Sequence, residues 1–291
     1  MRRAVRKADN APLVPRPPAA AEAAAARDRR NGFTLVELLV VIAIILLLIA
    51  LVSPTLSTAR ERGRTVMCLS QLRQIAVGFV AYADDNGGVP IPAIMPDSTA
   101  PRGGYWWPTS LREYLGDRRI LFCPSTRVSP PPRMGTLYSG QRDLSWSDGA
   151  QFPAAANRPE ESSYGHNMWV SDWDRSLNPW GWKGRYPRPL HYTRLSDIDV
   201  STRTPLFADS SWVGAWPDSR VELPRPFEIT QPMGPGSWND RLVRFALTRH
   251  NRRDLNVVFA DGHASTIRPH ELWLLNWHRG AVPRNVTIPW E

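Results

Sequence analysis

The chain has 291 residues, with 36 Lys and Arg against 27 Asp and Glu, which gives a formal net charge of +9. Eight of the basic and three of the acidic residues lie in the first 32 positions, so this segment contributes +5 of the charge. Because the remainder is only weakly basic, the charge gives little support for a nucleic-acid-binding protein, and we expect no nucleic-acid partner. The segment beyond the apolar run described below is long enough for one domain with its own core.

Residues 1–32 form a basic leader, and its stretch from Ala11 to Ala26 is rich in Ala and Pro. This composition is typical of a disordered segment. Cationic residues beside a membrane span stay on the cytoplasmic side, which sends the chain after the span outward. We therefore expect a single-pass membrane protein with a cytoplasmic N-terminus and a C-terminal domain on the outer side of the membrane.

Residues 33–54 are predicted to form a transmembrane helix. The run from Phe33 to Val52 is almost wholly apolar and contains one charged residue, Glu37. A span needs about 20 residues of this kind. An acidic side chain near the middle of a span costs roughly 2.5 to 3.5 kcal/mol, and less near its end. The presence of Glu37 near the start therefore suggests a function for its carboxylate.

The segment that begins at Gly32 resembles the type IV prepilin signal, which type IV pilins share with the pseudopilins of type II secretion. The resemblance implies that a prepilin peptidase cleaves between Gly32 and Phe33 and methylates the new amino group of Phe33. Glu37 would then be the fifth residue of the mature chain, where its carboxylate can pair with the terminal amine of a neighbouring subunit. The implied partners are the prepilin peptidase, other pilin or pseudopilin subunits and the inner-membrane secretion machinery. The implied location is the bacterial inner membrane, with a periplasmic or extracellular C-terminal domain.

Two other interpretations of this segment remain open. A secretory signal peptide could end at Ser57-Thr58-Ala59, although the apolar run is longer than the roughly 7 to 15 residues usual in such signals. An uncleaved anchor could keep Glu37 at the membrane interface. In any of these helices Pro54 lacks an amide proton, which predicts a bend.

Residues 55–88 are predicted to continue the helix outside the membrane. Apolar residues follow the i, i+3, i+4 spacing from Leu72 to Ala83, so one face should lie against a domain. The sequence Asn86-Gly87-Gly88 predicts the helix end. The charged tract from Arg60 to Arg64 is interpreted as a solvated face just outside the bilayer.

Further motifs resemble one subfamily of these pilin-like proteins. Its last element, named for a His, nine residues and Asp-Gly, is similar to His250 followed by Asp261 and Gly262. Ten residues separate His250 from Asp261 here, and we expect the extra residue to lengthen the turn at 252–254. The other motifs are Cys68 to Gln74, Tyr82 to Asn86, Phe122 to Ser125 and Ser163 to Asn167.

Residues 89–291 are predicted to form an α+β domain. The short apolar runs at 204–208, 255–260 and 264–268 predict strands, and Asp261-Gly262 predicts the turn of a hairpin. Residues 270–277 have the composition of a short helix. A helix followed by strands favours an outer helical half that covers an antiparallel sheet with long loops. The pilin resemblance implies the same pilin-like fold.

Four polar residues are weak candidates for a metal site, and no other cofactor is indicated. His250, Asp261 and His263 could meet near one end of the hairpin, and Asp209 could join them from another strand. The alternative, which the absence of a recognised metal motif favours, is that His250 and Asp261 fix the loop and the turn by hydrogen bonds. No nucleophile elbow or phosphate loop is present, so the sequence does not indicate an enzyme.

Cys68 and Cys123 are the two cysteines of the chain, and both lie in the part expected to be exported. An oxidising compartment would let them form a disulfide, which we favour over two buried thiols.

The domain also has many tryptophans, which fit core and loop packing better than a stacking surface for carbohydrate. These tryptophans are Trp106, Trp107, Trp169, Trp173, Trp180, Trp182, Trp212 and Trp216.

The best-supported function is that of a minor pilin or pseudopilin in a type II secretion or type IV pilus filament. The alternative is a membrane-anchored protein that binds carbohydrate or a divalent metal and does not polymerise.

Overall fold

The structure, a computed structural model, describes residues 33–96, 104–127, 142–147, 160–178, 181–218, 220, 242–245 and 248–288. The chain divides into two units, residues 1–52 and residues 53–291, each of which is described by itself. The predicted leader and Gly32 lie outside the described residues.

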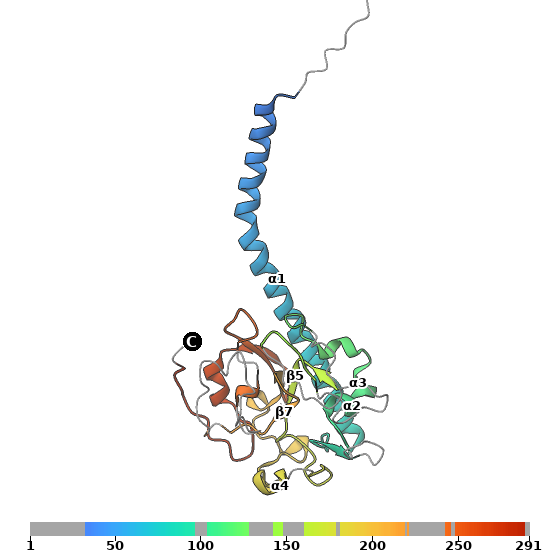
Figure 1. The fold of residues 1–291 in the computed structure, drawn as a ribbon. Coiled ribbons are helices and arrows are strands. Elements are labelled where there is room, and N and C mark those ends of the chain that lie inside the picture. Colours follow the sequence, from blue (N-terminus) through green and yellow to red (C-terminus); the bar gives the residue numbers. More distant parts are fainter. Residues whose placement is uncertain are drawn as a thin grey trace, which may run out of the picture. The chain divides into compact units, whose positions relative to one another are not determined.

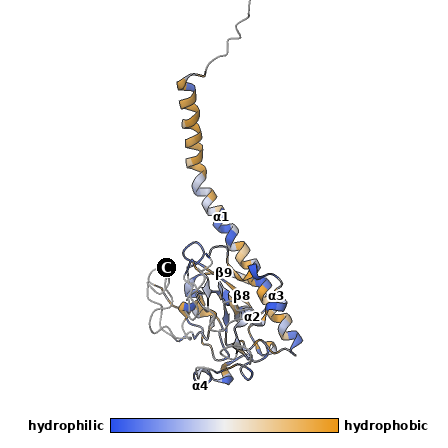
Figure 2. Ribbon diagram, turned by 45° about the vertical axis from the view of Figure 1, so that its right-hand side comes forward, coloured by the Kyte–Doolittle hydropathy of each residue, from blue (hydrophilic) through white to orange (hydrophobic). Residues whose placement is uncertain are grey.

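Helix α1 (Leu35–Asp85) begins in the first unit, where its side chains are all exposed. The residues from Leu35 to Val52 are long and apolar enough as a helix to cross a membrane, and Figure 2 shows them as a nearly continuous hydrophobic stretch. An exposed apolar surface around the whole helix is typical of a membrane span rather than a soluble surface helix. The predicted single transmembrane helix agrees with this arrangement. Pro54 lies inside α1, and the bend predicted there remains a prediction.

The part of α1 from Ser53 to Asp85 belongs to the second unit and has one buried face. Its end has the hydrogen bonds of a Schellman motif, because Gly88 N–H donates to Ala83 C=O (2.8 Å) and Gly87 N–H donates to Asp84 C=O (3.2 Å). Both glycines have positive φ angles, 65° at Gly87 and 82° at Gly88. The predicted helix end is therefore confirmed. The buried residues of the helix are Cys68, Leu72, Ile75, Ala76, Gly78, Phe79, Tyr82 and Ala83.

A five-stranded sheet in the order β7-β5-β6-β8-β9 forms the centre of the second unit. Its strands β5 and β7 are labelled in Figure 1. The predicted hairpin is confirmed, since β8 and β9 pair antiparallel and Gly262 in the turn between them has a φ of 86°. The strand predicted at 204–208 is β6, which pairs with β5 and β8. The strands are β5 (Tyr164–Asn167), β6 (Pro205–Asp209), β7 (Gly214–Ala215), β8 (Leu255–Phe259) and β9 (Ala264–Ile267).

The sheet differs from a purely antiparallel one because β7 pairs parallel to β5. The chain leaves β6 at Asp209 and crosses to the far side of β5 within a few residues, so β7 runs in the same direction as β5. Close backbone approach permits this crossing. A Cβ atom on Gly214 would lie 2.4 Å from the carbonyl oxygen of His166. Glycine at this position lets the two strands come together without a steric clash.

Short elements surround the sheet. The segment predicted as a helix at 270–277 is a 3-10 helix, η7 (Pro269–Leu274). Two further antiparallel pairs are β1 (Met95–Pro96) with β2 (Gly104–Tyr105), and β3 (Trp146–Ser147) with β4 (Glu161–Ser162). The other helices are α2 (Trp107–Ser110), α3 (Arg112–Leu115), α4 (Trp182–Arg185), η1 (Arg118–Leu121), η2 (Arg188–Leu190), η3 (Leu195–Asp197), η4 (Ser201–Arg203) and η6 (Leu242–Arg244).

Helix α1 packs on the sheet through aromatic side chains. The ring of Phe79 lies 5.5 Å from the ring of Phe207 on β6 and 5.4 Å from the ring of His166 on β5. Such contacts add to the hydrophobic stabilisation of the core. The α+β, pilin-like architecture expected from the sequence, with a long helix packed on a sheet, is confirmed.

The tryptophans mostly fill the interior of the second unit, as expected. Trp173 is partly buried, and Trp180 lies outside the described residues. The fully or nearly fully buried ones in the predicted set are Trp106, Trp107, Trp169, Trp182, Trp212 and Trp216.

Candidate functional site

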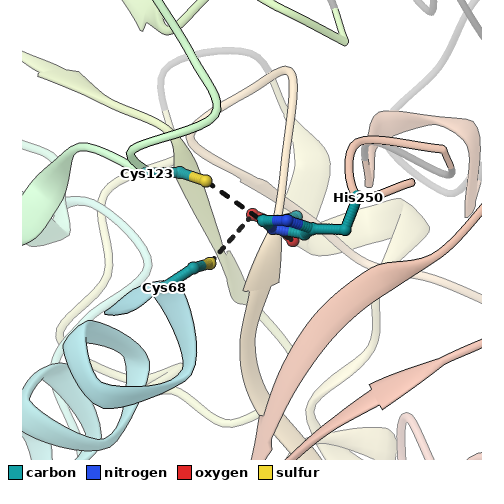
Figure 3. A group of neighbouring side chains, drawn as sticks. Cys68, Cys123 and His250 are labelled. Atoms are coloured by element: carbon teal, nitrogen blue, oxygen red, sulfur yellow. Dashed lines mark hydrogen bonds and ion pairs between the residues drawn. The ribbon is translucent and has the colours of Figure 1, made fainter. Parts of the chain in front are cut away.

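A buried cluster brings together Cys68, Cys123, Asp209 and His250, whose sulfur, oxygen and nitrogen atoms all lie within 4.8 Å of one another. Cys68 is on α1, Cys123 follows η1, Asp209 ends β6, and His250 precedes the turn into β8. At most 1 % of each residue is exposed. Figure 3 shows the side chains of the two cysteines directed toward the region of the His250 ring. Four separate segments therefore meet at one point in the core.

Polar contacts connect the four side chains directly. The Sγ atom of Cys68 lies 3.6 Å from Oδ1 of Asp209, and the Sγ atom of Cys123 lies 3.6 Å from Nε2 of His250. The same Nε2 atom is 3.1 Å from Oδ2 of Asp209. The Asp209 carboxylate and the His250 ring thus link the two sulfur atoms.

A second layer of groups orients the two cysteine sulfurs. The hydroxyl of Tyr164, which has a single proton, lies 2.7 Å from Oε1 of Gln71 and 3.3 Å from Sγ of Cys68. The N–H of Ser125 donates to Sγ of Cys123 (3.4 Å). Each sulfur is thus held at a fixed position.

The carboxylate of Asp209 also has outer partners. Nη1 of Arg249 donates to its Oδ1 atom (3.0 Å), and the N–H of Asn256 donates to its Oδ2 atom (2.8 Å). The Arg249 side chain is fully buried. A buried guanidinium beside a buried carboxylate reduces the cost of desolvating either charge.

The remaining ring nitrogen of His250, Nδ1, faces α1. It lies 3.3 Å from Oγ1 of Thr65 and 3.5 Å from Oε1 of Glu61. The hydroxyl of Ser125 donates to the same Glu61 oxygen (3.0 Å). Each of the four cluster residues therefore has at least one outer hydrogen-bonding or charged partner.

The turn after His250 is tight, and the lengthening expected from the extra residue of the motif stays a prediction. His250 and Asp254 form an isolated antiparallel bridge, with reciprocal backbone hydrogen bonds of 2.8 Å. Asn251 and Arg252 between them have positive φ angles of 50° and 60°. Left-handed backbone at two successive non-glycine residues makes a tight turn that directs His250 into the core.

Burial and the neighbouring charges shift the acid–base properties of the cluster. Burial raises the pKa of the Cys68 thiol well above its ordinary value. Burial also opposes ionisation of Cys123 and Asp209, but hydrogen bonds and the charges of His250 and Arg249 outweigh it and lower the pKa of both groups. Desolvation opposes protonation of His250, yet Asp209 and Cys123 raise its pKa. The interior therefore favours charged forms of Cys123, Asp209 and His250.

A thiolate next to a protonated imidazole is the pair that nucleophilic cysteine enzymes use. Here both members are enclosed, since Cys123 is 1 % exposed and His250 is 0 % exposed. A substrate needs access to the sulfur, so this burial favours a structural role over a catalytic one.

The beginning of α1 has a different kind of polar arrangement. The N–H and the hydroxyl of Thr34 each donate to Oε2 of Glu37 (2.8 Å), and the N–H of Glu37 donates to the Thr34 hydroxyl (3.2 Å). These reciprocal bonds form a capping box. The one carboxylate in the apolar stretch thus satisfies backbone donors at the helix start.

Residues 27–53 match the model for the prokaryotic N-terminal methylation motif. The matched segment contains the predicted cleavage position and most of the apolar stretch, and it supports a pilin-like protein with a prepilin-type N-terminus. Together with the one helix among the described residues that is long and apolar enough to span a bilayer, the match also supports a single-pass membrane anchor. Searches of curated proteins and of solved structures gave no match.

The predicted metal candidates separate into two places. Asp209 and His250 lie in the buried cluster, whereas Asp261 and His263 contact each other at the β8–β9 turn, with Nδ1 of His263 2.6 Å from Oδ1 of Asp261. The prediction that His250, Asp261 and His263 could meet is therefore wrong for the described structure. Asp261 binds the backbone N–H of His263 instead (3.1 Å) and so fixes the turn. The Asp261 carboxylate therefore contacts a residue only two positions later in the chain, as is usual for an aspartate in a turn.

Sequence analysis missed the participation of Glu61, Thr65 and the two cysteines. Glu61, Thr65 and Cys68 are spaced by four and three residues, the spacing of one helix face, and this pattern continues into the buried residues of α1. That spacing was the available signal. The interpretation of 60–64 as a wholly solvated tract is corrected at Glu61, which is partly buried against Ser125 and His250.

The two cysteines are free thiols in the structure. Their sulfur atoms lie within 4.8 Å of each other, so the chain does bring together the pair for which a disulfide was predicted. The disulfide itself remains a prediction.

Proposed function

We propose that this protein is a minor pilin or pseudopilin that assembles into a filament of the type II secretion or type IV pilus class. The matched methylation motif at residues 27–53 is the observation that carries the proposal. In this proposal a prepilin peptidase cleaves between Gly32 and Phe33 and methylates Phe33. Residues 33–54 then span the inner membrane, residues 55–88 form the outer half of the helix, and residues 89–291 form a domain on the extracytoplasmic side.

The capping box suggests how Glu37 acts before and after assembly. In the single chain its carboxylate accepts hydrogen bonds from Thr34, which offsets part of the cost of placing a charge at the end of an apolar helix. In a filament the same carboxylate can pair with the methylated amine of a neighbouring subunit, because two opposite charges in a low-dielectric environment stabilise each other. The apolar surface of the helix would pack against other subunits in place of lipid.

The alternative of a non-polymerising carbohydrate-binding protein has less support. Such a protein needs exposed aromatic side chains, whereas six tryptophans of the predicted set are buried in the described core. The other form of this alternative, a protein that binds a divalent metal, is compatible with the buried four-residue cluster but gives no account of the methylation motif, so we retain the filament subunit as the proposed function.

Mass spectrometry of the N-terminal peptide tests the processing step. The full-length chain should be isolated from membranes of a host with an intact prepilin peptidase, and in parallel from a host without it. We expect a peptide that starts at N-methylated Phe33 only where the peptidase is present. A start at Arg60, or an intact leader in both hosts, would contradict the proposal.

Two variants test assembly. Glu37→Gln preserves size and removes the charge, so we expect normal cleavage and loss of the subunit from sheared or pelleted filaments. Thr34→Val removes the hydroxyl that contacts Glu37 but leaves the carboxylate, so we expect it to assemble at close to the wild-type level. Equal failure of both variants after normal cleavage would assign Glu37 a capping role only and would reject the charge-pairing step.

A further inference from the structure

We propose that Cys68, Cys123, Asp209 and His250 bind one zinc ion that holds the extracytoplasmic domain together. This inference goes beyond the proposed filament function and does not depend on it, because the ligands lie in the folded core of residues 53–291. The four ligand atoms come from α1, the loop after η1, the end of β6 and the turn before β8.

The donor atoms indicate which metal fits. Two thiolate sulfurs, one imidazole nitrogen and one carboxylate oxygen are ligands that zinc accepts in tetrahedral sites. Calcium and magnesium prefer six or more oxygen ligands, which the two sulfurs of Cys68 and Cys123 do not provide. The set therefore favours zinc over the hard divalent cations.

The spacing of the ligand atoms also fits zinc. With Zn–S bonds of about 2.3 Å and Zn–N or Zn–O bonds of about 2.0 Å, a tetrahedron separates neighbouring ligand atoms by about 3.3 to 3.8 Å. In the structure Sγ of Cys68 is 3.6 Å from Oδ1 of Asp209, while Nε2 of His250 is 3.1 Å from Oδ2 of the same carboxylate and 3.6 Å from Sγ of Cys123. One ligand atom from each of the four residues lies within 4.8 Å of the others, so the side chains would draw together by up to about 1 Å to reach these tetrahedral separations around a zinc ion.

The residues that contact the four proposed ligands from outside the cluster are arranged like those around structural metal sites. A metal-binding histidine usually directs its second ring nitrogen to a carboxylate or another acceptor. Here Nδ1 of His250 faces Thr65 and Glu61, while Nε2 faces the other ligands. The N–H of Ser125 donates a hydrogen bond to Sγ of Cys123, which stabilises a thiolate bound to a metal, and the Tyr164 hydroxyl lies 3.3 Å from Sγ of Cys68.

The charges balance when zinc is present. Among the fully buried groups, two thiolates and one carboxylate carry three negative charges, and the zinc ion with the buried Arg249 guanidinium carries three positive charges; Glu61, which is partly exposed, lies outside this sum. Binding releases the thiol protons and the Nε2 proton, where these are present, to solvent. A buried site that is neutral overall avoids the large cost of an unpaired charge in the core.

Four protein ligands and nearly complete burial describe a closed, structural zinc site with no open position for a substrate. The ion would connect helix α1 to the sheet and to two loops. This connection gives the site a role in stability that does not require chemistry on a substrate.

Zinc content and cysteine state of the full-length, detergent-solubilised protein test the proposal. The protein is incubated with zinc sulfate, desalted, and analysed by elemental mass spectrometry. It is then denatured without reductant and alkylated, with and without a chelator. We expect about one zinc per chain and two alkylated cysteines without any reductant. Chelation should lower the Tm of the domain, and added zinc should restore it.

Cobalt substitution provides a second measurement that needs no mutation. Replacement of zinc by Co²⁺ should produce the visible absorption of a tetrahedral ion and the near-ultraviolet charge transfer of a thiolate-bound ion. Absence of both features from folded, cobalt-treated protein with free thiols would overturn the proposal.

Variants assign the ligands. Cys123→Ser should lose the bound zinc on desalting, and Glu61→Gln, which changes only an outer partner of His250, should weaken zinc binding by roughly 10-fold or more. The matched control is Asp261→Asn with His263→Asn, the exposed pair at the β8–β9 turn, which should retain about one zinc.

Three results would overturn the proposal. Cysteines that alkylate only after reduction would show the disulfide predicted from the sequence. Two free cysteines without retained zinc would show a metal-free thiol cluster. Zinc that stays in the Cys123→Ser variant and leaves the Asp261 and His263 variant would place the metal elsewhere.

Discussion

Two glycines determine how closely segments approach at the edge of the central sheet. A Cβ atom on Gly165 of β5 would lie 2.5 Å from Oγ of Ser210 and 2.8 Å from the carbonyl oxygen of Trp212. A Cβ atom on Gly214 of β7 would meet the backbone of His166. The parallel β5–β7 pair therefore depends on the absence of side chains at both positions.

We expect Gly165→Ala to destabilise the domain by about 1 to 3 kcal/mol, because backbone atoms have to move to accommodate the methyl group. The matched control is Gly184→Ala in α4, where no atom lies within 4 Å of the added Cβ. That change should alter the free energy of unfolding by less than about 1 kcal/mol. Chemical denaturation of both variants measures the difference, and equal stabilities would contradict the packing described for β5.

At the scale of elements, helix α1 has two segments with different surfaces. The residues up to Val52 are apolar on all sides, whereas the residues after Glu61 bury one face and expose the other. Phe79 is a central residue of the buried face, with ring contacts to both β5 and β6. Its neighbour Val77 is 69 % exposed.

Phe79→Ala should cost about 3 to 5 kcal/mol, since it removes a large buried ring and leaves a cavity between helix and sheet. Val77→Ala on the opposite face should change stability by less than about 0.5 kcal/mol. Unfolding of the detergent-solubilised chain, followed by tryptophan fluorescence, measures both values. Similar costs for the two variants would mean that this face of α1 does not pack on the sheet.

Local patterns predicted much of this fold. The i, i+3, i+4 spacing before Ala83, the glycines at the helix end and the Asp261-Gly262 turn each act over a few residues, so the sequence alone shows them. The candidate site is different, because Cys68 and Asp209 lie 141 positions apart and Cys123 and His250 lie 127 apart. Contacts over such separations depend on the complete packing of the sheet. The spacing of apolar residues within one helix or strand carries no information about them. The two-residue strand β7 was likewise too short to show a pattern.

At the scale of the whole molecule, two buried histidines make the domain sensitive to acid. Desolvation lowers the pKa of His166 and of His191 to about 3, against about 6.5 for an exposed histidine. Between these values the unfolded chain binds protons that the folded chain does not. The contribution of these two histidines to stability is therefore fully present above pH 6.5 and falls as the pH decreases toward 3.

His166→Phe should remove part of this dependence, because phenylalanine can take the place of the ring against Phe207 without a titrating nitrogen. Between pH 6.5 and 4 the wild type should lose about 3 kcal/mol relative to the variant, at about 1.4 kcal/mol for each pH unit. His191 is the same in both proteins and cancels. Urea denaturation at several pH values gives the comparison, and parallel stability profiles would contradict the neutral state of His166.

The positions of the four cluster residues along the chain determine the order in which the domain can be completed. Cys68 is made early, but His250 and strands β8 and β9 come close to the C-terminal end. Contacts across such long stretches form only after the entropy of closing them has been offset, so they form late in folding. The buried face of α1 can pack around Phe79 once β5 and β6 have been made, but the part around Cys68 stays incomplete until His250 follows. During biogenesis this gives a chaperone or a translocation pathway a long interval in which to bind the unfinished domain.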